Sequence, residues 1–82
     1  MPTVLRFGAY RVAVYTNDHR PAHVHVVGGS CEAVFHLHCP DGPPTLRESM
    51  GLSVPELNRI AARLEAELAK LCESWSNIHG PD

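Results

Sequence analysis

This sequence has few cysteines and no long apolar run. These two absences exclude several classes of small protein. Only three cysteines are present, at positions 31, 39 and 72, and no two of them have CxxC spacing. We therefore expect neither a disulfide scaffold nor a structural zinc ribbon, and we interpret Cys31 and Cys39 as free thiols in the core. No apolar run approaches the ~20 residues that span a bilayer, and Arg6 and Arg11 interrupt the segment where a secretory signal would lie. The sequence predicts a reduced, cytoplasmic protein without a membrane segment.

An excess of positive charge is also missing. The formal net charge is −2 with histidine neutral, so the composition has no overall nucleic-acid signature. The 82 residues, 44% of them hydrophobic, predict a single globular domain over residues 1–82. A chain of this length buries roughly 60–65% of its unfolded surface, so contacts with a partner or a second copy would supplement the core. Six histidines make the charge sensitive to pH between about 5 and 7.

Residues 1–49 have the composition and alternation of strands. Runs rich in β-branched and aromatic residues are separated by turns that contain glycine, proline, asparagine or aspartate. The predicted strands are residues 4–7, 10–15, 22–27 and 31–38, with turns at Gly8-Ala9 and Gly28-Gly29 and a loop over residues 17–21. The segment CPDGPP ends this region, and residues 46–49 fit a short edge strand or a loop equally well.

Residues 53–78 predict one long C-terminal helix. Ser53 and Glu56 have the spacing of a capping box, and apolar residues then recur every three or four positions up to Trp75. At 1.5 Å per residue the helix would exceed about 30 Å, which is longer than a small sheet covers. We therefore expect its end to dock on another chain, such as a second copy in a homodimer. The predicted fold is α+β: an antiparallel sheet of about four strands in chain order, packed against one long C-terminal helix.

Side-chain alternation sorts the histidines of two neighbouring strands. The apolar residues are even-numbered along residues 22–27 and odd-numbered along residues 31–38. They share one face only if paired residue numbers sum to an odd number, and a Gly28-Gly29 turn satisfies this with a sum of 57. In that register His25 lies opposite Glu32 and His23 opposite Val34. The face away from the helix then collects His23, His25, Glu32, His36 and His38, and the first hairpin adds Arg6 and Arg11 to it.

Paired imidazoles beside guanidinium groups suit cleavage of an RNA phosphodiester. One imidazole would take the proton of the 2′-hydroxyl, another would protonate the leaving oxygen, and arginine would hold the non-bridging oxygens. This hypothesis predicts a metal-independent, ribonuclease-like activity without a cofactor. Its catalytic residues are His23, His25 and Glu32, with Glu32 orienting His25, and its substrate-binding residues are Arg6, Arg11, Tyr15 and His36.

The same face has two other interpretations. His-x-His on one strand presents two imidazoles to a transition metal such as zinc, and the candidate ligands are His23, His25, His36 and Asp18. His-x-His also recurs by chance on solvated strands, so a face without any chemistry is the third interpretation. In that case Asp18 only satisfies backbone donors of its own turn. The residues alone leave all three open.

Four segments carry a resemblance to a known family. MPTVLRF, DHRPAHVHV, GGSCEAVFHL and the closing helix ELNRIAARLEAEL…W together resemble the small bacterial family called domain of unknown function 4160, over essentially the whole chain. The family signature, MPT-x-x-RF followed by D-H-x-P-x-H-x-H-V, falls here on Asp18, His19, Pro21, His23 and His25, with Glu32 in the matching E-A-V segment. Other members often carry acidic or amide residues near positions 36 and 38, so the resemblance favours His23 and His25 over His36 and His38.

The resemblance implies a biological role without naming an activity. Members are commonly encoded beside a small antitoxin-like protein and are regarded as toxins of type II toxin–antitoxin modules. The chain would accordingly be the toxin-like half of such a pair, bind a cognate antitoxin-like protein, and act on RNA or translation. The alternative is a non-catalytic or metal-binding interaction module that works through its partner and uses the His-x-His strand.

Overall fold

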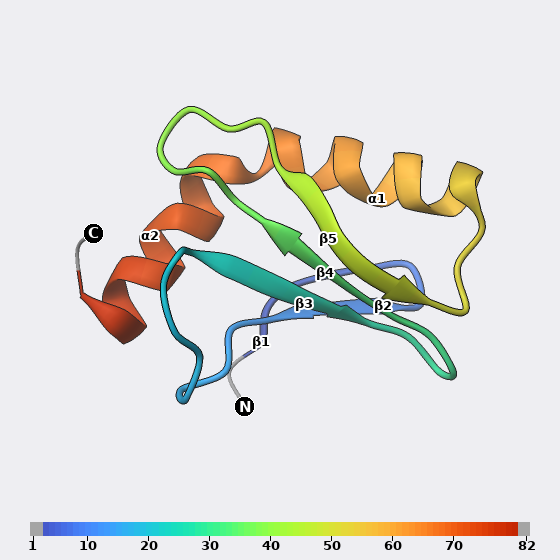
Figure 1. The fold of residues 1–82 in the computed structure, drawn as a ribbon, viewed down its shortest axis with the longest axis horizontal. Helices are drawn as coiled ribbons and strands as arrows, with labels where there is room; N and C mark the ends of the chain where they lie inside the picture. The colour runs from blue at the N-terminus through green and yellow to red at the C-terminus, as the bar shows by residue number, and fades with distance from the viewer. Residues whose placement is uncertain (1–2, 81–82) are drawn as a thin grey trace.

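A five-stranded antiparallel sheet and two C-terminal helices make up residues 3–80, the part of the chain that the computed structural model describes (Figure 1). The elements are β1 (Thr3–Phe7), β2 (Tyr10–Ala13), β3 (His23–Val27), β4 (Glu32–His36), β5 (Thr45–Met50), α1 (Val54–Ala66) and α2 (Leu68–His79). The strands lie side by side in chain order, which confirms the α+β prediction and adds a fifth strand where a strand and a loop fitted equally well. The Met1-Pro2 start of the family motif and Pro81, at the expected end of the helix, lie outside the described residues.

The first hairpin has the predicted register. Phe7 pairs with Tyr10 and Arg6 pairs directly with Arg11, so the two arginines lie on the same side of the sheet. The turn between them needs Gly8, whose φ of 55° lies in the left-handed region that glycine adopts without strain. The opposed arginines are a like-charge pair, which costs stability in a sheet unless solvent or an anion separates them.

The second hairpin has the predicted parity but a different register. His23 pairs with His36 and His25 with Val34, so the predicted pairs of His25 with Glu32 and His23 with Val34 are wrong. The pairing is shifted because the Gly28 N–H donates to the Cys31 carbonyl at 2.9 Å, which moves the turn one residue along the chain to Gly29-Ser30. Gly28 is required for space rather than for its φ, since a Cβ there would lie 2.6 Å from the Cys31 sulfur.

The residue numbers of the shifted pairs still sum to an odd number. The predicted assignment of side chains to the two faces of the sheet is therefore unchanged. The aliphatic face packs on the helices and forms one core, whose buried members are Val12, Val14, Ala22, Val24, Val26, Ala33, Phe35, Leu37, Ile60, Leu64, Leu68, Leu71 and Trp75. On the opposite face Ala13, His25 and Val34 follow one another across three strands. This opposite face is less open than expected, because Ala13, Val34 and His23 are buried.

The helical region begins where the capping box predicted. Ser53 is the N-cap, its hydroxyl accepts from the Glu56 N–H at 3.3 Å, and the Glu56 carboxylate accepts from the Ser53 N–H at 3.1 Å. Glu56 also accepts a hydrogen bond from the Tyr10 hydroxyl at 3.0 Å. The cap therefore satisfies orphan helix donors and also ties the start of α1 to the first hairpin.

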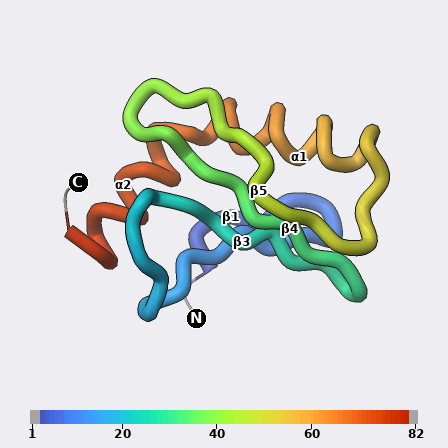
Figure 2. Tube along the Cα trace, in the orientation of Figure 1, coloured from blue at the N-terminus to red at the C-terminus, as the bar shows by residue number. Residues whose placement is uncertain are grey.

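The predicted single helix is divided in two at Glu67. Figures 1 and 2 show α1 running along the sheet and α2 turning away from its line toward the end of the sheet where β3 begins. Neither glycine nor proline causes the bend; instead, Leu71 and Trp75 of α2 are buried against the sheet, at 0% and 1% exposure. The bend lets the chain bury this part of the stripe itself, so helix length no longer argues for a second copy, and the homodimer stays a prediction. Within residues 3–80 neither helix is long and apolar enough to cross a bilayer.

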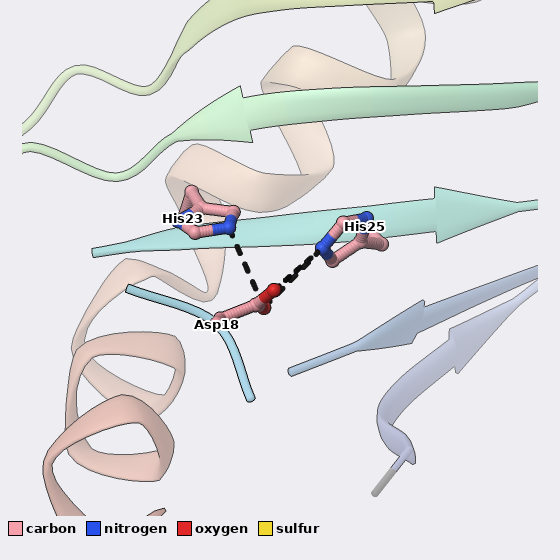
Figure 3. A group of neighbouring side chains, drawn as sticks. All are labelled: Asp18, His23 and His25. Atoms are coloured by element: carbon pink, nitrogen blue, oxygen red, sulfur yellow. Dashed lines mark hydrogen bonds and ion pairs between the residues drawn. The ribbon is translucent and has the colours of Figure 1, made fainter. Parts of the chain in front are cut away.

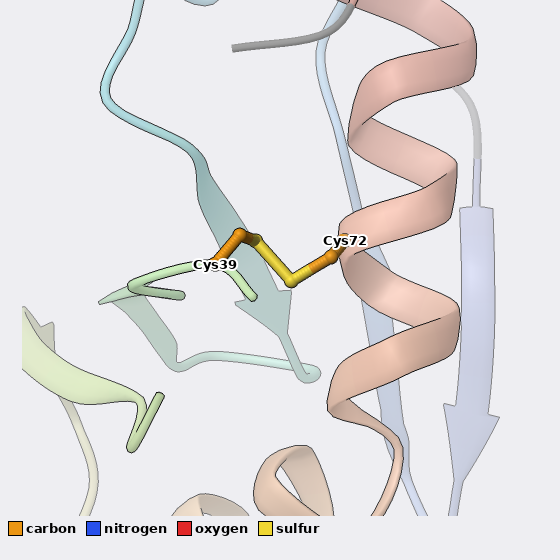
Figure 4. The surroundings of a disulfide bond; sticks show 2 residues. All are labelled: Cys39 and Cys72. Atoms are coloured by element: carbon orange, nitrogen blue, oxygen red, sulfur yellow. A yellow bond between two sulfur atoms is a disulfide. The ribbon is translucent and has the colours of Figure 1, made fainter. Parts of the chain in front are cut away.

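A disulfide joins Cys39 to Cys72 (Figure 4). Cys39 follows β4 and Cys72 lies on α2, and their Cα atoms are 5.8 Å apart. The interpretation of Cys39 as a free core thiol is therefore wrong, and Cys31 is the free cysteine of the described residues. Cysteine count and spacing could not reveal the bond, because its two cysteines are 33 residues apart and meet only in the folded chain.

Candidate functional site

The loop between β2 and β3 places Asp18 beside the first residues of β3. The Asp18 N–H donates to the Tyr15 carbonyl at 3.0 Å, and the Tyr15 N–H donates to Asp18 Oδ2 at 3.1 Å. These two bonds close a tight turn of the kind that aspartate favours. The carboxylate is thereby held at a fixed place above the sheet, where it faces the side chains of β3.

Asp18, His23 and His25 form a compact cluster (Figure 3). Asp18 Oδ2 lies 3.4 Å from His23 Nε2 and 3.2 Å from His25 Nε2, and the three ligand atoms lie within 4.8 Å of one another. The histidines come from alternate positions of one strand, so their rings project to the same side. The side chains are 7%, 14% and 10% exposed for His23, His25 and Asp18, which makes the cluster nearly dry.

The second nitrogen of each ring also has a partner. His23 Nδ1 lies 2.9 Å from the Pro21 carbonyl oxygen, which can only accept. His25 Nδ1 lies 3.4 Å from Glu32 Oε2. Glu32 thus contacts His25, as the orienting role requires, although it reaches the ring from a diagonal position and not from directly opposite. Both rings are held by groups on the far side from Asp18.

Aromatic rings support the cluster from the side. Tyr15 stacks on His25 with ring centroids 3.9 Å apart, and Trp75 of α2 packs on His23 at 5.3 Å. His79 in turn lies against Trp75 at 4.1 Å, and its Nε2 donates to the Tyr15 carbonyl at 3.0 Å. Burial, followed by the charge of Glu32, raises the pKa of Tyr15, so its hydroxyl stays protonated at neutral pH. The end of α2 therefore fixes both histidines and the Asp18 turn.

A cleft of about 510 Å³ adjoins the cluster. Its walls are Asn17, Asp18, His19, Arg20, Pro21, His23, His36 and Arg47. Arg20 donates to the carbonyl of His79 at 3.1 Å, so part of its guanidinium also anchors the end of α2. Burial, and next the charge of Arg47, lowers the pKa of His36, so its neutral form is favoured. The cleft combines cationic and imidazole groups with one edge of the cluster.

The predicted substrate-binding residues separate into two groups. Tyr15 and His36 adjoin the cluster, whereas neither Arg6 nor Arg11 lines the cleft. His36 does not belong to the cluster of Asp18, His23 and His25 that could hold a metal ion, although the predicted ligand set contained it. His38 lies beyond β4 with a φ of 54°, and its ring contacts the Thr45 hydroxyl at 2.7 Å, so strand alternation does not apply to it.

The arginines of the cleft were missed by sequence reasoning. Arg47 lies on β5, where all six residues are exposed, so its sequence has no alternation between buried and exposed faces. Arg20 lies in the loop before β3, where side-chain direction follows no period. One signal was present for Arg20: it stands inside the D-H-x-P-x-H-x-H segment that supplies the cluster.

One family matches most of the chain. Residues 9–76 match the family described as Domain of unknown function (DUF4160), a span that includes the Asp18 turn, both histidines of β3 and most of α2. No curated protein and no solved structure matches the chain. The match confirms the resemblance carried by the DHRPAHVHV segment and adds no activity to it. The chain therefore belongs to the DUF4160 family.

Proposed function

We propose that the chain is the toxin-like half of a toxin–antitoxin pair and that it cleaves a phosphodiester bond of RNA in the cleft beside Asp18, His23 and His25. One observation carries the proposal: the cleft that borders this cluster is also lined by Arg47, His19 and His36. A guanidinium and imidazoles in one cleft suit a phosphate group, because arginine holds two phosphate oxygens at once and imidazole supplies further N–H donors.

The size of the cleft suits one nucleotide unit, and its exposed arginine leaves room for a chain that extends beyond it. Its volume of about 510 Å³ lies within the usual range for ligand sites, and Arg47 is half exposed at its rim. Within residues 3–80 the ion-pair partner of Arg47 is the Glu48 carboxylate, at 3.6 Å, so most donors of the guanidinium can turn to a phosphate. Because RNA is the proposed substrate, we keep the cytoplasm as the expected compartment.

Cleavage would place the scissile phosphate between Arg47 and the cluster. The 2′-hydroxyl oxygen attacks phosphorus, the bond from phosphorus to the 5′-oxygen breaks, and the 2′-proton ends on that leaving oxygen. His23, His25 and Asp18 are the groups that we assign to the reacting end, with Glu32 holding His25 and Tyr15 stacked on it. Arg6 and Arg11, outside the cleft, have no role in this step.

Induced expression in bacterial cells tests the activity. We expect growth arrest and new RNA 5′ ends with the wild-type chain, and loss of both with His25→Ala and with Arg47→Ala. Thr45→Val is the matched control on β5, since it lies outside the cleft walls. Equal arrest by the wild type and both variants, or arrest without new RNA ends, would contradict the proposal.

The partner half of the proposal has a separate test. The product of the gene beside this one, expressed at the same time, should bind the chain and restore growth. Copurification on a tagged partner, with the untagged chain in stoichiometric amount, measures the binding. A neighbouring gene product that neither binds the chain nor restores growth would contradict the toxin–antitoxin assignment. The expression experiment would still decide whether the chain cleaves RNA.

A further inference from the structure

We propose that Asp18, His23 and His25 bind one divalent transition-metal ion, with zinc as the ion that their ligand atoms fit best. The site uses the same residues as the proposed function, yet the argument for it rests on hydrogen-bond geometry and does not require RNA to be the substrate. It replaces the metal-independent activity expected from the sequence with a metal-dependent one.

The hydrogen bond of His23 leaves a lone pair facing Asp18. The Pro21 carbonyl oxygen cannot donate, so the hydrogen of the ring must be on Nδ1, which lies 2.9 Å from it. In the neutral ring Nε2 then carries a lone pair, and this nitrogen lies 3.4 Å from Asp18 Oδ2. Two acceptors face each other across that distance. A cation between them turns this repulsion into two favourable contacts.

His25 has the same conflict with two carboxylates. Its Nδ1 faces Glu32 Oε2 at 3.4 Å and its Nε2 faces Asp18 Oδ2 at 3.2 Å. A neutral imidazole has one N–H, so it can donate to only one of the two oxygens. If Nδ1–H donates to Glu32, the Nε2 lone pair points at Asp18 beside that of His23. Three acceptor atoms then lie within 4.8 Å of one another.

The outer contacts are those of metal-binding histidines in general. Such histidines bind the ion through one nitrogen and donate the other N–H to a backbone carbonyl or a carboxylate, which fixes the ring. His23 has the carbonyl of Pro21 in that position, and His25 has the carboxylate of Glu32. A strand with histidines that merely faced solvent would need neither contact.

The two separations measured from Asp18 Oδ2 also fit an ion. Zinc bonds nitrogen and carboxylate oxygen at about 2.0–2.2 Å, and two ligands at such lengths on a tetrahedron lie roughly 3.3–3.5 Å apart. The two Nε2 atoms lie 3.4 and 3.2 Å from Asp18 Oδ2. Two imidazoles and one carboxylate leave a fourth position free, which is the arrangement of catalytic rather than structural zinc sites.

The burial of the Asp18 carboxylate gives an electrostatic reason for a bound cation. The Asp18 side chain is 10% exposed and its immediate neighbours are two rings that carry no charge when neutral. A carboxylate removed from water needs a positive partner, and a divalent ion supplies it for Asp18. With the ion bound, His23 and His25 act as ligands, and the ion supplies a Lewis acid next to the cleft.

The test is metal binding by the full chain, purified without a polyhistidine tag and stripped with a chelator. Titration with zinc chloride by calorimetry should give one equivalent, and cobalt(II) should give the visible absorption of a site with fewer than six ligands. Asp18→Asn and His25→Ala should each lower the affinity at least about 10-fold, because loss of an outer partner alone costs about 10–100-fold.

Two matched variants control for other ligands. His38→Ala removes an exposed imidazole that contacts Thr45, and Cys31→Ser removes the free thiol, so both should bind zinc as the wild type does. Circular dichroism checks each fold; if Asp18→Asn unfolds because the Tyr15 turn is lost, His25→Ala alone decides. No zinc binding by the wild type, or equal binding by the wild type and His25→Ala, would overturn the metal site. Asp18, His23 and His25 would then interact only through hydrogen bonds and charge. A chain that arrests growth yet binds no metal would overturn this inference and not the RNA proposal.

Discussion

At the scale of single residues, Asp18 serves both the loop and the cluster. Its carboxylate accepts from the Tyr15 N–H and faces the Nε2 atoms of His23 and His25. The interpretation of Asp18 as a turn residue and its interpretation as a ligand are therefore compatible. The turn fixes the position of the carboxylate before any ligand binds, which reduces the entropy lost on binding.

The residues of the cluster could be predicted from the sequence better than their contacts. Alternation along a strand is local, so the positions of His23 and His25 on one face followed from neighbouring residues alone. Moving the turn by one residue changes the sum of the paired residue numbers by two, which leaves the alternation unchanged. The sequence therefore could not distinguish a Gly28-Gly29 turn from a Gly29-Ser30 turn. Arg47 escaped prediction because an edge strand exposed on both faces has no alternation to detect.

Glu32 gives a prediction that distinguishes the metal site from a simple charge cluster. Glu32→Ala should lower zinc affinity about 10-fold, because His25 loses the acceptor that orients its ring and raises its basicity. Calorimetry on the stripped chain measures it. Glu48→Ala is the control, since this carboxylate lies opposite Val34 on the neighbouring strand. Affinity unchanged in Glu32→Ala would show that the 3.4 Å contact with His25 has no part in metal binding.

At the scale of elements, the start of α1 combines helix capping with a contact to the sheet. The Ser53 backbone N–H, then the Ser53 hydroxyl and the Tyr10 hydroxyl, lower the pKa of Glu56 below its usual 4.5. A carboxyl whose folded-state pKa is lowered stabilises the protein above its unfolded pKa, and this contribution is lost as pH falls through the folded value. The cap is thus a source of acid sensitivity.

We predict that Glu56→Gln flattens the acid limb of the stability curve. The wild type should lose unfolding free energy as pH falls below 4.5, whereas the variant, already less stable at pH 7, should lose less over the same interval. Urea unfolding at a series of pH values measures both chains. Parallel curves for the two proteins would mean that the contacts of Glu56 with Ser53 and Tyr10 do not persist in solution.

The division of the helical region shows what local signals leave out. The apolar stripe of residues 53–78 is compatible with a straight helix and with a bent one, because Leu64 before Glu67 and Leu68 and Leu71 after it keep helical spacing. The bend depends on contacts with β3 and on the link to Cys39, both distant in sequence. Capping, in contrast, involves residues three apart, and its prediction was confirmed.

At the scale of the whole molecule, α2 connects the core, the disulfide and the cluster. Cys72 and Trp75 lie one turn apart on α2; the first is bonded to Cys39 and the second packs on His23. Loss of the disulfide would free the loop after β4 and the middle of α2 in the same step. A closed loop with a sequence separation of 33 residues contributes about 3–4 kcal/mol in the chain-entropy account.

The disulfide can be tested by counting the free thiols of the chain. Disulfides are uncommon in reducing compartments, so the bond conflicts with the reduced state that the sequence suggested. Protein unfolded without reductant in the presence of an alkylating agent should gain one alkyl group, on the thiol of Cys31. Three thiols would contradict the bond. Cys72→Ser should lower the free energy of unfolding by about 3 kcal/mol, and Cys31→Ser is the control.

The central claim is that the Asp18 turn and the first residues of β3 together hold one metal ion at the edge of the cleft. Anomalous diffraction from crystals of the full chain grown with zinc, measured on both sides of the zinc absorption edge, tests it directly. We expect one strong anomalous peak at about 2.0–2.2 Å from His23 Nε2, His25 Nε2 and Asp18 Oδ2. A peak only at other residues, or no peak beside these three atoms, would contradict it.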